Sequence, residues 1–535
     1  MKTSKWLIVI LGILLISAAA WYGVFRLTQN VVPELSRDQL STEQKLADFD
    51  YLYNTMKENY PYFDVKARIN NYNWLAHKDE FKQWVIDTKN DKEYGNTINR
   101  IIKLVQSGHT NLVGYDFYKD VADIYSDPLK GYSPARRNVL KNDLVADKIQ
   151  YWNRLITTYD HYMPLIIKYV EGNYVVFDGE LADLNIPQGS ILKTVGQQAV
   201  DEYVKNLGDK IYLEYDYKRH KQIASELYVF TEPGEVMNFT FQTPSGELIS
   251  RDIKQREMSA AVYDRYYQGY SNRNFRTEVL EKNKTAYIRM SSMMVKGDTQ
   301  YEADRKEIED FLKQIKDYPY LIVDIRGNGG GSTGYWSGAL VSRLIEKSIF
   351  FKSYILYRDT EYITPFVKDR YDTYNAKSTQ DLPENNNYAP EVKSFGKYIE
   401  IQDGVVSYNP IHFKGKVYLL VDGGVYSAAE SFAVFAKTSK WATLVGTTTG
   451  GDGIGAEPGY LSLPNSGILV RVPVAMGLNP DGSINEEAHT QPDFYVEQSY
   501  QDVLAQLKND ENPMMEISSH DTVLNYVLEQ IREGK

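Results

Sequence analysis

The stretch "VYLLVDGGVYSAAESFAVFAK", residues 417–437, places a serine between a predicted strand and a predicted helix. The apolar run 417–421 is typical of a buried strand, and the pair Gly423-Gly424 follows it. Ser427 then opens a segment whose Ala and Phe residues recur at helical spacing. Two interpretations stay open here. Ser427 either caps the helix as the start of an S-x-x-E capping box, or it is a nucleophile beside helix N–H groups that face a developing negative charge.

Other apolar runs have the same character as 417–421. "TAYIRMSSM", "YLIVDIRG" and "ATLVGTTTG" are short and continuous, and helical patterns at 300–316, 333–347 and 427–440 separate the predicted strands. Such alternation predicts an α/β domain with a central, largely parallel sheet flanked by helices. In these sheets the active site forms at the carboxyl ends of the strands, where the turn before Ser427 is expected to lie.

A second glycine-rich turn, "DIRGNGGGS" at 324–332, follows another predicted strand. Its backbone N–H groups could form a nest for an anion such as an oxyanion, and a merely flexible turn is the alternative. A phosphate loop is not indicated, because no Gly-Lys-Ser/Thr follows.

A serine nucleophile needs a base, usually His or Lys, and the chain has seven histidines. His109 in "QSGHTNL" and His489 in "EEAHTQPD" are the candidates, since the others lie in polar or variable surroundings. The properties of the residues alone leave the choice between these two open.

The bulk composition describes a globular chain of more than one domain, with 535 residues, 43% hydrophobic and 24% charged. A net charge of −11 argues against a nucleic-acid partner, which would require a basic face. Cysteine is absent, which excludes disulfides, thiolate metal sites and a cysteine nucleophile. We predict no cofactor and no metal.

The N-terminal segment predicts a membrane anchor at 1–26. Lys2 and Lys5 precede residues 6–25, an uncharged run that would span ~30 Å as a helix. Its length favours an uncleaved signal anchor, and a cleaved signal peptide with a site near 18–20 is the alternative. The lysines should stay inside, so we expect a single-pass cell-membrane protein with its catalytic part outside the cytoplasm, or a secreted one if cleavage occurs.

Composition shifts divide the remaining chain. We predict a linker at 27–40, a helical region with a covering segment at 41–165, a small β-rich domain at 166–257, an α/β core at 275–500 and a helical tail at 501–535. Residues 115–165 show no clean period, so we expect a mixed segment there that covers a groove.

Four blocks carry a resemblance to a known family. "LIVDIRGNGGG", "VDGGVYSAAESFA", "ATLVGTTTGGDG" and "AHTQPDFYV" resemble, in the same order, the signature blocks of the C-terminal processing peptidase and tricorn-core family of serine peptidases. The resemblance implies a ClpP/crotonase-like core and a polypeptide substrate. "NIPQGSILKTVGQQAV" is similar to part of the family's PDZ domain, so residues 166–257 are expected to be PDZ-like.

The resemblance also implies roles for residues of both glycine-containing turns. Ser427 falls on the nucleophile, and Ala428 would supply the neighbouring N–H of an oxyanion hole. Gly330, with Gly329 as the alternative, would complete that hole.

The resemblance implies a histidine base rather than a lysine. The processing-peptidase branch has a lysine about 25 positions after the serine, where this chain has Asp452, a feeble base towards a hydroxyl. The tricorn-like Ser-His-Glu branch is therefore expected, with His109 as general base and then acid and with Glu486, or Glu487 beside it, orienting the imidazole. Gly108 stands where that branch has a serine.

Two functional hypotheses follow. The first is a membrane-anchored, extracytoplasmic serine endopeptidase that cleaves peptides or unfolded proteins. The second, motivated by Asp452, is a non-catalytic peptide- or ligand-binding protein on the same fold. The distance between the Ser427 hydroxyl and the His109 imidazole separates them.

Overall fold

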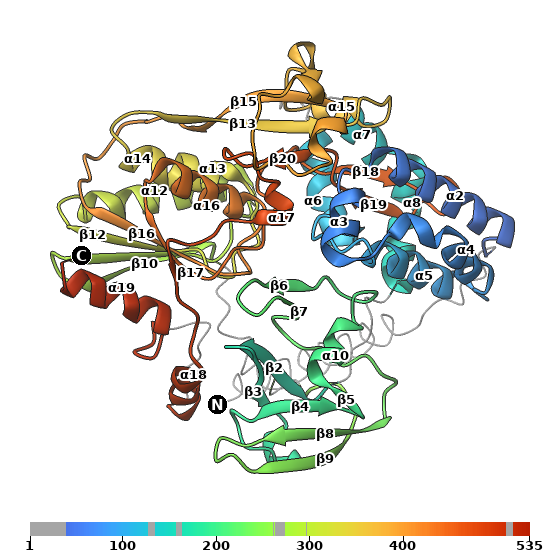
Figure 1. Cartoon of the computed structure of the whole chain (residues 1–535), viewed down its shortest axis with the longest axis horizontal. Coiled ribbons are helices and arrows are strands. Elements are labelled where there is room, and N and C mark those ends of the chain that lie inside the picture. Colours follow the sequence, from blue (N-terminus) through green and yellow to red (C-terminus); the bar gives the residue numbers. More distant parts are fainter. Residues whose placement is uncertain are drawn as a thin grey trace, which may run out of the picture. The chain divides into compact units, whose positions relative to one another are not determined.

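A computed structural model describes residues 39–126, 134–156, 163–259, 262, 273–295, 297–509 and 517–534. Their secondary structure forms a helical section, a β-rich section and an α/β core that continues into C-terminal helices (Figure 1). No helix within these residues has the length and apolar character needed to cross a membrane. The predicted anchor at 1–26 and most of the linker lie outside the described residues.

The helical section begins at residue 42. Helix α5 illustrates its construction, because the Asn90 side chain accepts from the N–H of Glu93 at the first turn and Ile98, Ile101 and Ile102 are fully buried along one face. The helices of this section are α2 (Thr42–Asn59), α3 (Phe63–Asn70), α4 (Lys78–Ile86), α5 (Asp91–Lys103), α6 (Tyr115–Ser126), α7 (Pro134–Leu140) and α8 (Asp143–Leu155).

Helices α6 to α8 correct the expectation of a mixed segment at 115–165. They bury Val121, Leu140 and Ile149 in one cluster with Tyr460 and Leu469 of the core. Much of their apolar surface comes from tyrosine and isolated aliphatic residues, so the sequence lacks a continuous apolar stripe. The segment packs against strands of the core.

The β-rich section contains an antiparallel sheet in the order β2-β3-β4-β8-β9, with β5 paired to β4. Its longest pairing is the hairpin of β8 and β9, with the turn Pro244-Ser245-Gly246 between them. The strands of this section are β2 (Leu165–Val170), β3 (Asn173–Gly179), β4 (Ile191–Val195), β5 (Gln198–Ala199), β6 (Glu214–Asp216), β7 (Lys221–Ile223), β8 (Val236–Gln242) and β9 (Leu248–Lys254). Short helices α9 (Leu181–Leu184) and α10 (Val200–Lys205) connect them.

The core is organised by a sheet in the order β10-β11-β12-β16-β17-β21. Only the pairing of β10 with β11 is antiparallel; the other four pairings are parallel. The strands are β10 (Phe275–Glu281), β11 (Thr285–Met290), β12 (Tyr320–Asp324), β16 (Lys416–Val421), β17 (Thr443–Gly446) and β21 (Phe494–Tyr495). The turns that follow β12, β16 and β17 therefore meet at one edge of the sheet.

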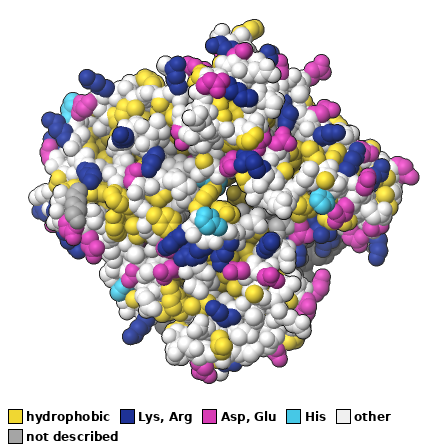
Figure 2. Space-filling view, viewed as in Figure 1, with side chains coloured by type: hydrophobic (Ala, Val, Ile, Leu, Met, Phe, Trp, Pro, Cys, Tyr) yellow, Lys and Arg dark blue, Asp and Glu magenta, His cyan; other side chains and the backbone are white. Residues whose placement is uncertain are grey.

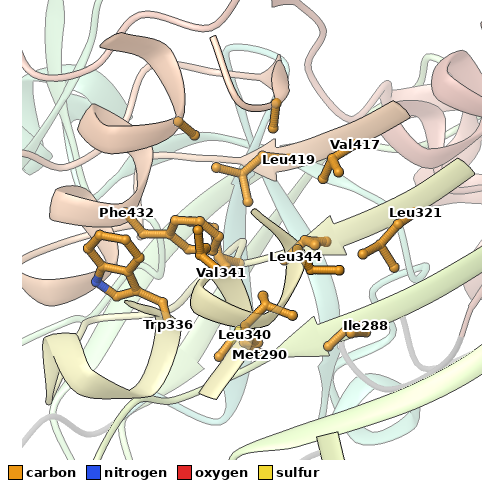
Figure 3. Packing of buried hydrophobic residues seen from close by; sticks show 14 of the residues in the cluster. Ile288, Met290, Leu321, Trp336, Leu340, Val341, Leu344, Val417, Leu419 and Phe432 are labelled. Carbon is orange, nitrogen blue, oxygen red and sulfur yellow. The ribbon is translucent and has the colours of Figure 1, made fainter. Parts of the chain in front are cut away.

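Helices cover both faces of this sheet (Figure 1). Helices α12 (Asp298–Gln314), α13 (Thr333–Trp336), α14 (Ser342–Leu344) and α16 (Ala428–Ser439) lie on one side and α19 (Thr522–Arg532) lies on the other. Alternate residues of β12 enter different clusters, since Leu321 and Val323 pack with Phe432 whereas Ile322 packs with Val527. Figure 3 shows the first of these clusters, in which strand and helix side chains interdigitate.

A second sheet, β14-β15-β13-β20, and a small sheet, β1-β19-β18, complete the core. Their strands are β13 (Ile349–Tyr357), β14 (Lys377–Ser378), β15 (Lys397–Val405), β18 (Gly459–Ser462), β19 (Leu469–Val472), β20 (Met476–Leu478) and β1 (Asn111–Leu112). The remaining α-helices of the described residues are α15 (Thr364–Lys368), α17 (Asn485–Ala488) and α18 (Tyr500–Lys508). Strand β1 comes from the helical section, and its pairing with β19 joins that section to the core.

Charged side chains of both signs are spread over the face drawn in Figure 2. One compact group of basic side chains lies near its centre, and elsewhere Lys and Arg are interspersed with Asp and Glu. The described residues thus present mixed charge on this face rather than a continuous basic stripe.

The packing of α16 on the sheet makes a stability prediction. Phe432 is fully buried and stacks on Trp336, with ring centroids 5.0 Å apart. Replacing Phe432 with Ala should lower the free energy of unfolding by about 3–5 kcal/mol, because a cavity remains where the ring was. The control is Phe350→Ala, since Phe350 is 53% exposed. Equal urea midpoints for the two variants would contradict this account of the core.

Candidate active site

Ser427 does not act as a helix cap. Its side chain accepts no N–H from the first turn of α16, and its backbone lies at φ 57° and ψ −122°, a region that non-glycine residues rarely occupy. Glu430, the other half of the predicted capping box, instead accepts from Asn485 and Thr490. The capping interpretation is therefore wrong. The strained turn is of the kind that presents a serine hydroxyl at the end of a strand.

His109 reaches Ser427 from the helical section. It follows α5 and lies two residues before β1, whose Asn111 and Leu112 pair with Arg471 and Val470 of β19. This pairing ties the histidine to the core. The His109 Nε2 atom lies 3.1 Å from the Ser427 Oγ atom, and His109 is only 7% exposed. The distance is within hydrogen-bond reach of a nucleophile.

The other nitrogen of His109 contacts Asp452, not Glu486. The Nδ1 atom lies 2.5 Å from Asp452 Oδ2, and the Tyr426 hydroxyl lies 3.3 Å from the same oxygen. The predicted orienting role of Glu486 is contradicted, since its carboxylate forms an ion pair with Lys66 at 2.8 Å.

The alternative, Glu487, does not contact the imidazole either. Its carboxylate accepts two hydrogen bonds from Arg68, in the last turn of α3. One sequence feature could have identified Asp452 as the partner of His109. It lies 25 residues after Ser427, where the family resemblance places a lysine that must face the nucleophile. A carboxylate there is a poor base for a serine but a suitable partner for a histidine.

The charge states suit an imidazole that accepts a proton. Burial lowers the pKa of His109 below its ordinary value, and Asp452 opposes this shift only in part. Burial raises the pKa of Asp452, but His109 and Lys66 outweigh it and hold that pKa below the ordinary value. A neutral imidazole beside an ionised carboxylate donates from Nδ1, which leaves Nε2 to accept the Ser427 proton.

Gly108 has a steric explanation. A Cβ atom at this position would lie 2.8 Å from the Tyr426 ring, whose centroid is 4.8 Å from that of His109. Tyr426 therefore occupies the space that a side chain at position 108 would need. The tyrosine packs on the imidazole and also approaches Asp452, so it holds both groups.

Two of the three predicted oxyanion donors have available N–H groups. Within the described chain, no acceptor lies on the N–H of Ala428 or of Gly329. Gly330 differs from the expectation, because its N–H donates to Asn328 Oδ1 at 2.9 Å. Gly330 has a steric role instead: its φ is +100°, and a Cβ there would approach Ala428 N to 2.8 Å and Ser427 Cβ to 2.9 Å.

His489, the other candidate base, has its own partners. Its Nδ1 lies 2.7 Å from the carbonyl oxygen of Thr449, and its Nε2 lies 3.2 Å from that of Glu486. Burial lowers the pKa of His489 to about 4, so the ring is neutral near pH 7. It contributes to the packing of the loop around Asp452 and does not contact Ser427.

A cavity of about 580 Å³ lies beside these turns. Tyr169, Glu214 and Tyr217 of the β-rich section line one part of it, and Gly327, Gly423 and Thr448 of the core turns line another. Within the described residues, no group of three or more His, Cys, Asp or Glu side chains could hold a metal ion.

The fold and the pairing of a strained serine with a histidine define a serine-type peptidase. Residues 284–496 match the model of Peptidase family S41. This match confirms the predicted resemblance to that family of peptidases.

Solved structures with the same fold include mature CPAF and its complex with lactacystin. The complex is 13% identical, covers 92% of this chain and 99% of its own, and has a TM-score of 0.57. Mature CPAF is 14% identical; the match covers 89% of this chain and 99% of the CPAF chain, with a TM-score of 0.55. No curated protein matches the sequence. At these identities the structural likeness establishes the fold.

The environment of His109 predicts its titration. The midpoint followed by histidine NMR should fall below the ordinary pKa of 6.5, because burial disfavours the charged ring. In Asp452→Asn it should fall further, because the carboxylate that favours the imidazolium is gone. A midpoint that rises in this variant, or stays unchanged, would show that Asp452 does not interact with His109.

Proposed function

We propose that this protein is a membrane-anchored, extracytoplasmic serine endopeptidase that cleaves peptides or unfolded proteins. The observation that carries the proposal is the line of contacts from Asp452 through His109 to Ser427, at 2.5 Å and 3.1 Å. These groups have the order of orienting acid, base and nucleophile that acyl transfer requires.

In the proposed reaction, His109 Nε2 takes the hydroxyl proton of Ser427 as Oγ attacks the peptide carbonyl carbon. The carbonyl oxygen gains the negative charge, and the N–H groups of Ala428 and Gly329 are the donors proposed for it. The imidazolium then gives its proton to the leaving amine, and the peptide C–N bond breaks to give an acyl-serine. Water, deprotonated by His109, hydrolyses the ester and regenerates the hydroxyl.

Asp452 supports this proposal rather than the non-catalytic alternative. That alternative rested on the replacement of an expected lysine base by an acid. Since the acid lies 2.5 Å from the imidazole, the replacement is compatible with a histidine-based mechanism. Its role would be to hold the Nδ1–H tautomer and to stabilise the imidazolium.

The β-rich section supports a polypeptide substrate. We propose that it is a PDZ-like domain that binds an extended chain by adding a strand to a sheet edge. Strand β9 ends the sheet order within the described residues, with Leu248 66% exposed. The cavity lined by Tyr169 of β2, at the other edge of this sheet, has the size to receive side chains of a bound peptide.

The proposed location rests on sequence alone. Residues 6–25 are uncharged, with Lys2 and Lys5 before them, which is the pattern of a signal anchor with its lysines inside. The peptidase core would then act outside the cytoplasm, and cleavage of the segment would instead give a secreted enzyme.

A serine-reactive phosphonate tests the proposed chemistry. Wild-type protein should be labelled on Ser427, and His109→Ala should lose the labelling because no base remains. Asp452→Asn should slow it by roughly 10³- to 10⁴-fold, because the wrong tautomer faces the serine. Peptide mapping locates the label, and Ser427→Ala is the control. Labelling that persists in His109→Ala would refute the assigned base.

A further inference from the structure

Helix α3 brings two kinds of cation to the same short segment of the core. Lys66 forms an ion pair with Glu486 at 2.8 Å, with side-chain exposures of 11% and 1%. Two residues further along α3, Arg68 binds Glu487 and Glu391, and its side chain is 37% exposed. The two neighbouring glutamates are therefore paired to the same helix in very different surroundings.

A buried lysine at position 66 is not needed to attach α3 to the core, because Arg68 already attaches this helix at the surface. Removing a lysine from water costs free energy unless it meets a specific negative charge. The turn that carries Asp452 lies beside the helix that carries Glu486, because the N–H of Gly453 donates to Asn485 Oδ1 at 2.6 Å. Lys66 pairs directly with Glu486, and it lowers the pKa of both carboxylates.

The two carboxylates oppose one another. Burial and then Asp452 raise the pKa of Glu486, so Glu486 resists carrying a charge beside an ionised Asp452. During the proposed reaction Asp452 must remain ionised to face the imidazolium of His109. A cation near both acids is what permits this charge distribution in a buried site.

We propose that Lys66 is a positioning residue of the catalytic centre: by pairing with Glu486 it keeps the neighbouring Asp452 ionised and available to His109. This inference rests on the proposed function. Lys66 contacts neither Ser427 nor the imidazole, and it acts through the two carboxylates. Glu486 thus belongs to the charge balance of the site even though it does not orient the ring.

Other groups face this pair from every surrounding element. The titratable neighbours of Glu486 are Tyr60 and Tyr62 from the α2–α3 region, Tyr212 and Tyr217 from the β-rich section, and Tyr426, Asp452 and His489 from the core. Burial raises the pKa of all five tyrosines and lowers that of His489, so these groups are uncharged near neutral pH. Lys66 is then the fixed cation that balances the two acids.

The test measures the rate of Ser427 labelling by a phosphonate between pH 5 and pH 9, conditions that bracket the ordinary histidine pKa. Lys66→Met should lower the rate about 10- to 100-fold near neutral pH, the range typical of groups that orient a reacting partner. The deficit should shrink as the pH rises, because the acids without their cation ionise only at higher pH. Lys66→Arg should restore the wild-type profile.

A double variant separates charge balance from folding. Lys66→Met with Glu486→Gln removes both charges, so it should fold and should recover most of the rate that Lys66→Met loses. Arg68→Met is the matched control on the same helix, and its profile should coincide with that of the wild type. Circular dichroism checks that each variant is folded.

Different outcomes overturn different claims. A Lys66→Met profile parallel to that of the wild type at every pH, or a double variant no better than Lys66→Met, would overturn the positioning role and leave the serine mechanism intact. Absence of any label on Ser427 in the wild type would overturn the proposed function, and the inference with it.

Discussion

The His109 imidazole is the constraint on which the arrangement of the site depends. It joins Ser427 and Asp452, which lie 318 and 343 positions further along the chain. Its place is fixed on one side by α5 and on the other by the pairing of β1 with β19. The core supplies the nucleophile and the acid, but only the docked helical section supplies the base. Folding of the two sections against each other therefore assembles the site.

The core presents its two groups at a local conformational cost. Both Ser427 and Asp452 have positive φ values, 57° and 51°, which are unfavourable for residues that carry a Cβ atom. Neighbouring aromatic residues hold this geometry, since Tyr426 packs on the imidazole and Tyr62 lies 3.4 Å from Asp452 Oδ1. A buried Glu430, whose pKa burial raises to about 7, links α16 to the loop at 485–490.

Sequence patterns were sufficient to predict the elements that carry the nucleophile. The alternation of short apolar strands and helices corresponds to β11, β12, β16, β17 and the helices between them. Strand β12 shows the reason. Its successive residues pack against helices on opposite faces of the sheet, so both faces of the strand are buried and the run is continuously apolar. The choice of Ser427 and His109 came from the family resemblance, because nothing in their local sequence distinguishes them from a cap and a structural histidine.

Other features depend on contacts that a linear pattern does not encode. Asp452 acquires its role from a residue 343 positions away, and considered alone it is a carboxylate in a glycine-rich turn. Glu486 was the expected acid, but it forms an ion pair with Lys66 from α3 instead. Helices α6 to α8 were not predicted, because tyrosine forms much of their packing surface and gives no clear apolar pattern in the sequence. In each case a partner from a distant segment decides the outcome.

The central claim is that Asp452, not Glu486, holds the imidazole while Nε2 serves Ser427. A crystal structure of the phosphonate adduct tests it most directly, because the adduct resembles the tetrahedral intermediate. We expect a bond from Ser427 Oγ to phosphorus, His109 Nδ1 still on Asp452, and a phosphonate oxygen at the N–H of Ala428. An adduct with Nδ1 bound to Glu486, or with phosphorus on another residue, would contradict the account.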